Sequence, residues 1–357
     1  MKTPGFFYRR STGPALSLLL APLQVASWGY RAGAFLHARA HAGLRRNRRL
    51  ACGVVSVGSP MVGGTGKTPL AARVASLLQA EGYRVALASR GYGTTRDETV
   101  SVVSDGRSLL TSLDSSGDEP RVLAAHAPGV PVLVARDRGL AGLRAIEEFG
   151  TEILVLDDGF GHHRLARDLE VVTLDGGMGL GNGHVLPRGP LREGLAGLSR
   201  ADAVVVADGP LPEVDEARLA AHASAASWFE SSRRVSRLRL LSGGEPIPAD
   251  HLKGREVGLL CGIAYPASFE ALVASLGADI VSRRFLADHH RYRPADVENL
   301  SKAAPLWIVT EKDAVKLDPV WLQGSEVWVL EIEIDPDEGF VRWLSESVRS
   351  RIFPEGR

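Results

Sequence analysis

Short apolar runs alternate with helical patterns through the first two-thirds of the chain. Strand-like runs occur at 53–58, 84–89, 152–156 and 170–174, and the apolar residues of 69–78 recur at helical spacing. Strands that alternate with helices assemble into parallel sheets. We therefore predict an α/β domain with a parallel sheet, and we expect ligands at the edge where the strands end.

The pattern changes after about residue 223. Residues 224–241 are polar and β-prone, which is typical of a linking ribbon. A second, smaller α/β unit follows, with strands at 256–261 and 306–310 and a helix at 267–276. We predict four parts: an N-terminal helical arm (1–50), a larger α/β domain (51–223), a linker ribbon (224–245) and a smaller α/β domain that closes over the site (246–357).

The N-terminal arm is apolar and basic. Residues 15–29 are apolar but contain Pro22 and Gln24, so they fall short of the ~20 residues that a spanning helix needs. The first 50 residues hold nine basic residues and no acidic one, within a chain that has 42 of each. We expect this arm to lie on an anionic membrane surface. A core helix followed by a solvated basic face is the alternative, and the zero net charge argues against a nucleic-acid partner.

A glycine-rich segment joins the first strand to the first helix. Backbone N–H groups that lead into a helix bind phosphate, Lys67 can reach the β- and γ-phosphates, and the Thr68 hydroxyl can bind Mg²⁺. Met61 departs from the usual P-loop pattern, which has glycine there. A chance cluster among 39 glycines is the alternative. We predict a site for ATP and Mg²⁺ formed by Gly63, Gly64, Thr65, Gly66, Lys67 and Thr68.

Acidic residues follow a buried strand at the expected ligand edge. Asp157 and Asp158 come directly after 152–156, and such a pair is costly there unless a cation or a donor satisfies it. We therefore interpret the pair as Mg²⁺ ligands, with a strand-end turn as the alternative. Asp118 and Glu119 stand at a probable helix start, where on local grounds they cap the helix.

Two loops have chemistry that local sequence leaves open. Tyr92, in Arg90-Gly-Tyr-Gly93, either packs against a base or belongs to a plain turn. Arg192 ends a Gly/Pro-rich stretch, 181–193, that either clamps a phosphate or is structural.

Taken together, these strings resemble the tetraacyldisaccharide 4'-kinases, the lipid A 4'-kinases of Gram-negative envelope synthesis. The resemblance covers about residues 12–320, and its motifs occur in the order of the family. They are GGTGKTP (63–69), SRGYG (89–93), GDEP (117–120), DDGFGHHRLARD (157–168), the GNG…LP…GPLRE segment (181–193), DHH (288–290) and TEKDAVK (310–316).

The resemblance implies a P-loop kinase that transfers the γ-phosphoryl group of ATP to the 4'-hydroxyl of an acylated glucosamine disaccharide 1-phosphate, at the cytoplasmic face of the inner membrane. It makes Asp118 the general base, paired with His289 of the second domain. A His partner would orient the carboxylate and help to store the proton. Lys67 and Thr68 hold phosphate and Mg²⁺, and the site is completed by Glu119, Asp157, Asp158, Arg192 and, as a weaker match to the family, Arg138.

The chain departs from the family pattern at Gly161, where the family has glutamine. His290 varies in the family, which favours His289 as the catalytic histidine. The residues Glu311, Lys312 and Asp313 lie either at the edge of the site or in a surface turn. The alternative function is a membrane-associated P-loop ATPase that switches partner binding without a phosphorylated lipid product. ATPases of that class usually have a second lysine near the start of the loop, where this chain has Met61 and Val62.

Overall fold

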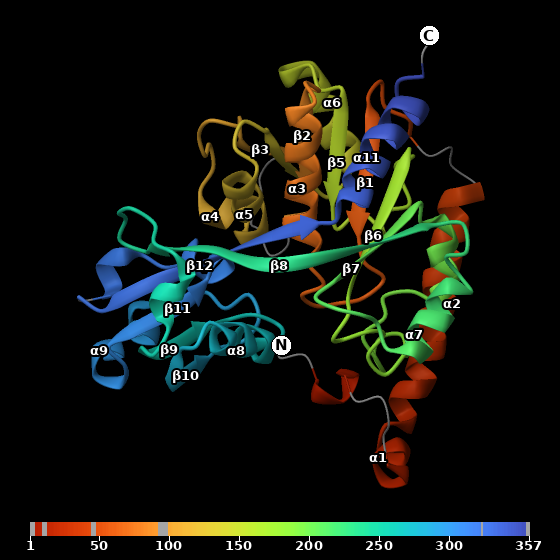
Figure 1. Ribbon diagram of the computed structural model, residues 1–357. Helices are drawn as coiled ribbons and strands as arrows, with labels where there is room; N and C mark the ends of the chain where they lie inside the picture. Colours follow the sequence, from red (N-terminus) through yellow and green to blue (C-terminus); the bar gives the residue numbers. More distant parts are fainter. Residues whose placement is uncertain (1–3, 9–12, 44–47, 92–98, 323, 355–357) are drawn as a thin grey trace. The chain divides into compact units, whose positions relative to one another are not determined.

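The computed structural model describes residues 4–8, 13–43, 48–91, 99–322 and 324–354. Tyr92, Arg45 and Arg46 lie outside the described residues, as does the side chain of Arg39. The chain forms two compact units, a larger one with residues 4–232 and 334–357 and a smaller one with residues 233–333. The chain leaves the larger unit within strand β8 (Ser227–Leu240) and re-enters it within β12 (Glu326–Pro336) (Figure 1).

The larger unit has a mostly parallel sheet in the order β8-β7-β6-β1-β5-β2-β4-β3. Among the described strands in this order, only the edge strand β3 runs antiparallel, beside β4. The strands are β1 (Gly53–Gly58), β2 (Val85–Ser89), β3 (Val100–Ser104), β4 (Val132–Ala135), β5 (Ile153–Asp157), β6 (Leu169–Asp175) and β7 (Ala203–Ala207). Those predicted from apolar runs are present to within one residue at each end, and a mixed α/β fold dominated by a parallel sheet is confirmed.

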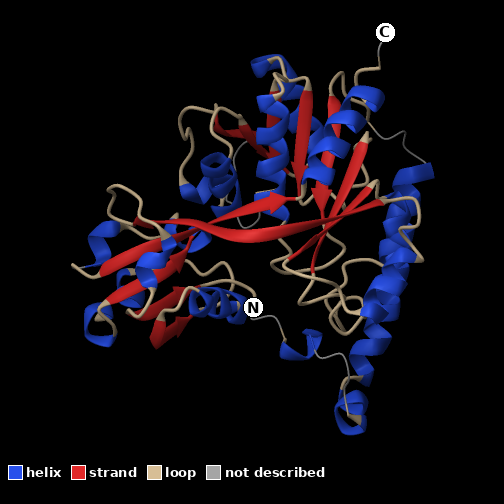
Figure 2. Cartoon of the chain, in the orientation of Figure 1, coloured by secondary structure: helices blue, strands red, loops and turns tan. Residues whose placement is uncertain are grey.

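Helices cover both faces of this sheet (Figure 2). Side chains alternate along a strand, so Val55 and Val57 of β1 enter one core while Val54 enters the other. The first core is covered by α3 (Lys67–Ala80), α5 (Asp118–His126) and α11 (Glu338–Arg351), and the second by α6 (Arg138–Phe149). The remaining helices of this unit are α1 (Pro14–Leu19), α2 (Ala21–Gly43), α4 (Leu113–Ser116) and α7 (Glu213–Ala220).

The smaller unit repeats the α/β pattern on a second, mostly parallel set of strands. Its order is β10-β9-β11-β12-β8, in which β9 pairs in parallel with β10 and β11, and β11 with β12. Apolar side chains are buried on both faces of these strands, in two separate clusters. The elements are β9 (Glu256–Cys261), β10 (Asp279–Phe285), β11 (Leu306–Thr310), α8 (Pro266–Ser275), α9 (Leu300–Ala303) and α10 (Glu311–Ala314).

The N-terminal arm is helical and partly attached to the larger unit. Ser27 of α2 is buried, and its hydroxyl lies 3.0 Å from both the Val185 carbonyl oxygen and the Arg188 amide nitrogen. By contrast, Leu18 and Leu19 are 78% and 75% exposed, and Trp28 is also exposed. None of the described helices is both long and apolar enough to cross a bilayer.

Candidate active site

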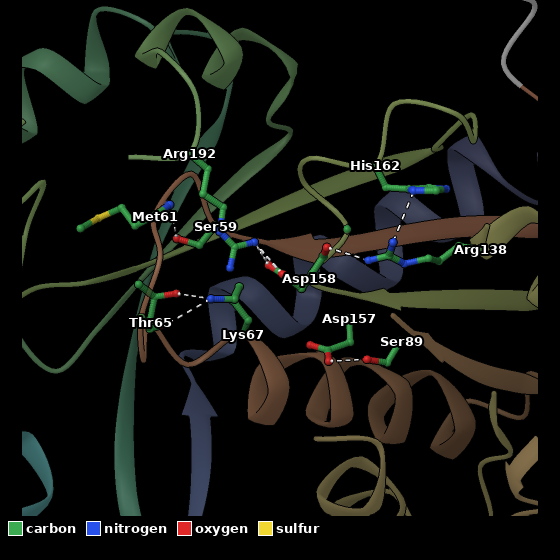
Figure 3. A network of polar contacts seen from close by, with 12 residues as sticks. Ser59, Met61, Thr65, Lys67, Ser89, Arg138, Asp157, Asp158, His162 and Arg192 are labelled. Carbon is green, nitrogen blue, oxygen red and sulfur yellow. Dashed lines mark hydrogen bonds and ion pairs between the residues drawn. The ribbon is translucent and has the colours of Figure 1, made fainter. Parts of the chain in front are cut away.

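The glycine-rich segment lies between the end of β1 and the first turn of α3, at the edge predicted to hold ligands. Gly66 caps α3 with φ 79°, and a Cβ there would come within 2.8 Å of Ile334 Cδ1, so both conformation and space favour glycine. The Lys67 ammonium lies over the loop, 3.1 Å from the Gly63 carbonyl oxygen (Figure 3). Thr173 of β6 donates a hydrogen bond of 2.6 Å to the Thr65 carbonyl and so fixes the loop to the sheet.

The departure at Met61 has a packing explanation. The Met61 side chain is fully buried in an apolar cluster with Phe160 and Leu191. The neighbouring backbone is hydrogen bonded to the 185–192 loop, with Val62 N donating to Pro190 O and Arg192 N donating to Pro60 O. The start of the glycine-rich segment is therefore held by core packing and by a second loop.

The two adjacent acids at the end of β5 point in different directions (Figure 3). Asp157 is buried and accepts a hydrogen bond of 3.3 Å from the Ser89 hydroxyl at the end of β2. Asp158 has the left-handed φ of 53° and meets the guanidinium of Arg192, whose Nη1 lies 2.6 Å and 2.8 Å from its two carboxylate oxygens. One acid is therefore tied to the neighbouring strand end, while the other makes a charged pair with a loop.

Electrostatics keep Asp158 ionised. Burial alone would raise the pKa of this carboxyl, but the positive charges of Lys67 and Arg192 outweigh burial and hold the pKa below its usual value. Burial likewise opposes the charge on Arg192, yet Asp158 and Glu119 raise the pKa of its guanidinium. Lys67, Asp158, Arg192 and Glu119 thus belong to one electrostatic cluster.

Arg138 joins the same cluster from the start of α6. Its guanidinium donates to the Asp158 carbonyl oxygen at 3.3 Å and lies 3.4 Å from His162 Nδ1. Burial and the adjacent Arg138 charge lower the pKa of His162 to about 3, so this imidazole is neutral at physiological pH. Gly161 is exposed, and no atom lies within 4 Å of the position that a Cβ would take, so a Cβ at this place would meet no obstacle.

Asp118 and His289 belong to different units of the chain. Asp118 is buried at the first position of α5, which packs against α3, and its carboxylate accepts a hydrogen bond of 3.0 Å from the Glu119 amide. His289 follows β10 in the smaller unit, with φ 56° and its Nε2 3.9 Å from the Asp288 carboxylate. The pairing of Asp118 with His289 across the active site remains a prediction.

Ser89 and Thr173 are two site residues to which the sequence analysis gave no role, although Ser89 stands in the SRGYG motif. Each is an ordinary small polar residue in a β-rich run, and each acts through a strand that is distant in sequence from its partner. The carboxyl ends of neighbouring parallel strands meet at one edge of the sheet. From this rule one could have predicted that Ser89, at the end of β2, lies beside Asp157, at the end of β5.

Comparison with known proteins tests whether the chain belongs to the family that its motifs resemble. The family model LpxK, Tetraacyldisaccharide-1-P 4'-kinase, matches residues 16–349. The chain belongs to this family. A tetraacyldisaccharide 4'-kinase of Anaeromyxobacter dehalogenans strain 2CP-1 is 40% identical over 341 residues, which cover 93% of this chain and 90% of that protein. The 4'-kinase of Syntrophus aciditrophicus is 38% identical over 346 residues, 92% of either chain.

A solved structure of the 4'-kinase family has the same fold. The crystal structure of LpxK from Aquifex aeolicus in complex with ATP superposes with a TM-score of 0.74 at 29% sequence identity. The alignment covers 95% of this chain and all of that one. The resemblance read from seven motifs is therefore confirmed at the level of the family and the fold, and the family match favours the kinase over the ATPase switch.

Proposed function

We propose that this protein transfers the γ-phosphoryl group of ATP to the 4'-hydroxyl of tetraacyldisaccharide 1-phosphate, a step of lipid A biosynthesis. The carrying observation is the cluster of Lys67, Asp158 and Arg192 beside a glycine-rich loop, in a chain that belongs to the 4'-kinase family. Phosphoryl transfer needs positioned positive charge more than covalent chemistry. This cluster supplies that charge at the amino end of α3.

Lys67 and the loop are proposed to hold the nucleotide phosphates. The helix amino terminus and the loop N–H groups favour an anion. The Lys67 ammonium lies near the Gly63 carbonyl and the Thr65 hydroxyl, contacts that a γ-phosphate oxygen would replace. Arg192 would add a planar charged group from the opposite loop, oriented by Asp158.

A Mg²⁺ ion fits the oxygen donors at the end of β5. Thr68, Asp157 and Ser89 offer hydroxyl and carboxylate oxygens, which are the ligands that Mg²⁺ prefers. In the described ranges no three His, Cys, Asp or Glu side chains form a metal site by themselves. Mg²⁺ commonly completes its shell with phosphate oxygens and water. Bound there with Asp158 and Glu119 nearby, the ion would neutralise charge on the transferred phosphoryl group.

The remaining assignments rest on the family resemblance. Asp118 is proposed as the general base that accepts the proton of the 4'-hydroxyl, with His289 of the smaller domain as its partner and Tyr92 against the base of ATP. Closure of the smaller domain over substrate is proposed because the sequence assigns Asp118 and His289 to different domains; the predicted smaller domain of 246–357 differs from the smaller unit, since residues 334–357 belong to the larger one.

The N-terminal arm is proposed to bind the inner membrane from its cytoplasmic side. Apolar side chains stand exposed along α1 and α2, including Leu18, Leu19 and Trp28. Arg31, three residues after Trp28, and Arg49, at the end of the arm, are exposed, and the first 50 residues contain no acidic residue. An amphipathic, basic surface of this kind suits an anionic lipid surface on which an acylated acceptor is presented.

The deciding experiment is transfer of labelled γ-phosphate from ATP to tetraacyldisaccharide 1-phosphate in detergent with Mg²⁺. The intact protein should give labelled lipid, and Lys67→Ala should lower turnover by about a hundredfold or more because a positioned charge is lost. Lys302→Ala, an exposed lysine of the smaller unit, is the matched control and should retain full turnover. Phosphate release without labelled lipid would refute the kinase and support the ATPase switch.

A further inference from the structure

A fully buried carboxylate lies in the smaller unit, within the TEKDAVK motif whose role the function has not accounted for. Asp313 of α10 has no exposed surface. Its Oδ2 accepts a hydrogen bond of 2.6 Å from the Thr310 hydroxyl, and Oδ1 lies 3.1 Å from the Lys316 ammonium. Thr310 caps the same helix, because its hydroxyl accepts a hydrogen bond from the Asp313 amide.

Two further contacts of Asp313 reach outside its own motif, one with the Tyr292 hydroxyl and one with Gly262. Oδ1 accepts a hydrogen bond of 3.0 Å from the Gly262 amide, at the point where the chain leaves β9. The carbonyl of the same Gly262 accepts a hydrogen bond of 3.1 Å from the His289 amide. One peptide segment therefore connects the buried carboxylate to the backbone of His289.

The His289 loop is closely fitted to Gly262. A Cβ at Gly262 would lie 2.9 Å from the Ala287 carbonyl oxygen and 3.1 Å from His290 Cβ. His289 itself has φ 56°, a left-handed conformation that a non-glycine residue keeps only when its surroundings hold it. The contact at Gly262 is part of what holds it there.

The buried ion pair of Asp313 with Lys316 is by itself weak evidence that the carboxylate serves stability. Lys316 is nearly buried and lies over the Tyr292 ring, with its Nζ 5.4 Å from the centroid. Burial and the negative charge of Asp313 raise the pKa of Tyr292, so the phenol stays protonated. Buried ion pairs are often replaceable by apolar residues without loss of stability, because desolvation offsets their attraction. A charged group at this place is better explained by what it orients.

We propose that Asp313 is a positioning residue for His289, acting through the Gly262 peptide to hold the histidine loop in its left-handed conformation. This inference rests on the proposed catalytic role of His289. It assigns to TEKDAVK a function inside the smaller unit: Thr310 and Lys316 orient the Asp313 carboxylate, and the carboxylate orients the loop.

The test is a double-mutant cycle on the full chain with ATP and the acylated acceptor. Asp313→Asn keeps the size of the side chain but removes the charge. It should lower kcat by about tenfold or more in the wild-type background, since a displacement near 1 Å of a reacting group is costly. The KM for ATP should change by less than about twofold. In the His289→Ala background the same substitution should have no further effect on kcat.

Two further variants serve as a control for the substitution and as a replacement if it prevents folding. Asp202→Asn is the matched control, because Asp202 also accepts a backbone hydrogen bond, from Glu170 N at 2.8 Å, at the opposite end of β6 from the site. It should leave kcat unchanged. If Asp313→Asn does not fold, as judged by its melting curve, Gly262→Ala takes its place, since the added Cβ displaces the same loop.

Each outcome separates the two proposals. An equal loss of kcat in the wild-type and His289→Ala backgrounds would overturn the positioning role of Asp313. Full activity of both Asp313→Asn, which keeps an oxygen able to accept from the Gly262 amide, and Gly262→Ala would overturn it as well. If instead His289→Ala retains wild-type kcat, the catalytic role of His289 fails first, while transfer of phosphate to the lipid still stands as the proposed function.

Discussion

Replacing Glu170 by glutamine tests whether desolvation or ion pairing has the larger effect on the free energy of unfolding at a buried ion pair. The pair lies next to residues 158–160, the segment that follows β5. Glu170 is the second residue of β6, and its Oε2 lies 2.5 Å from Arg167 Nη1. Only 4% of the Glu170 side chain and 10% of the Arg167 side chain are exposed. The same Arg167 nitrogen donates to the carbonyls of Gly159 and Phe160, so the pair supports the backbone that follows Asp157 and Asp158.

The two effects predict opposite results. Breaking a buried ion pair commonly costs about 3–5 kcal/mol, which would make Glu170→Gln unstable. Burial, however, raises the pKa of Glu170 from 4.5 to about 7, and it outweighs the opposing charge of Arg167. An acid whose pKa is raised on folding binds more protons in the folded state, so stability falls as pH rises from 4.5 through 7. The shift corresponds to roughly 3 kcal/mol lost by the wild type at high pH.

The assay is thermal unfolding of wild type and Glu170→Gln between pH 4.5 and pH 8. The melting temperatures should agree near pH 4.5, where the protonated glutamate resembles glutamine. At pH 8 the variant should melt higher, by about 6–12 °C for a unit of this size. Glu148→Gln breaks an exposed pair with Arg144 and should show a pH-independent difference of at most about 0.5 kcal/mol. A variant that is less stable than wild type at pH 8 would refute the dominance of desolvation.

Part of the fold was predictable from unbroken apolar runs, although the buried run of β7 was not identified as a strand. The run at 256–261 is a strand with those bounds, and the ends of β1 and β5 agree with expectation within one residue, because fully buried parallel strands read as unbroken apolar runs. The edge strand β3 was not predicted. Its partner β4 lies some thirty residues away in sequence, and an antiparallel edge strand has no helical crossover to mark it.

The candidate site was predictable in its members and not in its contacts. Lys67, Asp158 and Arg192 were all expected, yet the sequence did not show that Arg192 would pair with Asp158 while Asp157 turned toward Ser89. That division depends on the left-handed backbone at Asp158, which separates two adjacent carboxylates. Such a conformation is set by tertiary contacts, among them the hydrogen bond from Arg138 to the Asp158 carbonyl, and local sequence does not encode it.

Three further predictions concern catalysis and the membrane. Arg192→Lys should lower kcat/KM by about tenfold or more, because an ammonium lacks the planar geometry of the guanidinium, and steady-state kinetics would contradict the proposed role if the lysine variant matched wild type. Asp118→Asn should lower kcat at unchanged ATP affinity, whereas an equal loss of ATP affinity in nucleotide titrations would place it at the nucleotide instead. Replacing exposed Leu18 and Leu19 with serine should reduce flotation with anionic vesicles but not turnover in detergent, and unchanged flotation would contradict the membrane role.

A last prediction links the arm to the chemistry. Ser27 of α2 accepts a hydrogen bond from the Arg188 amide and faces the Val185 carbonyl, both in the loop that carries Arg192. Ser27→Ala would remove the hydrogen bonds between α2 and this loop, at about 0.5–1.5 kcal/mol each, while the Arg188 and Gly189 amides still donate to the Val185 carbonyl. It would loosen the attachment of the loop without changing the exposed apolar side chains of the arm. We therefore expect lower kcat in detergent with normal vesicle flotation, the reverse of the Leu18 and Leu19 result. If Ser27→Ala instead lost flotation and kept kcat, the arm would serve only as an anchor, and the loop would hold Arg192 without it.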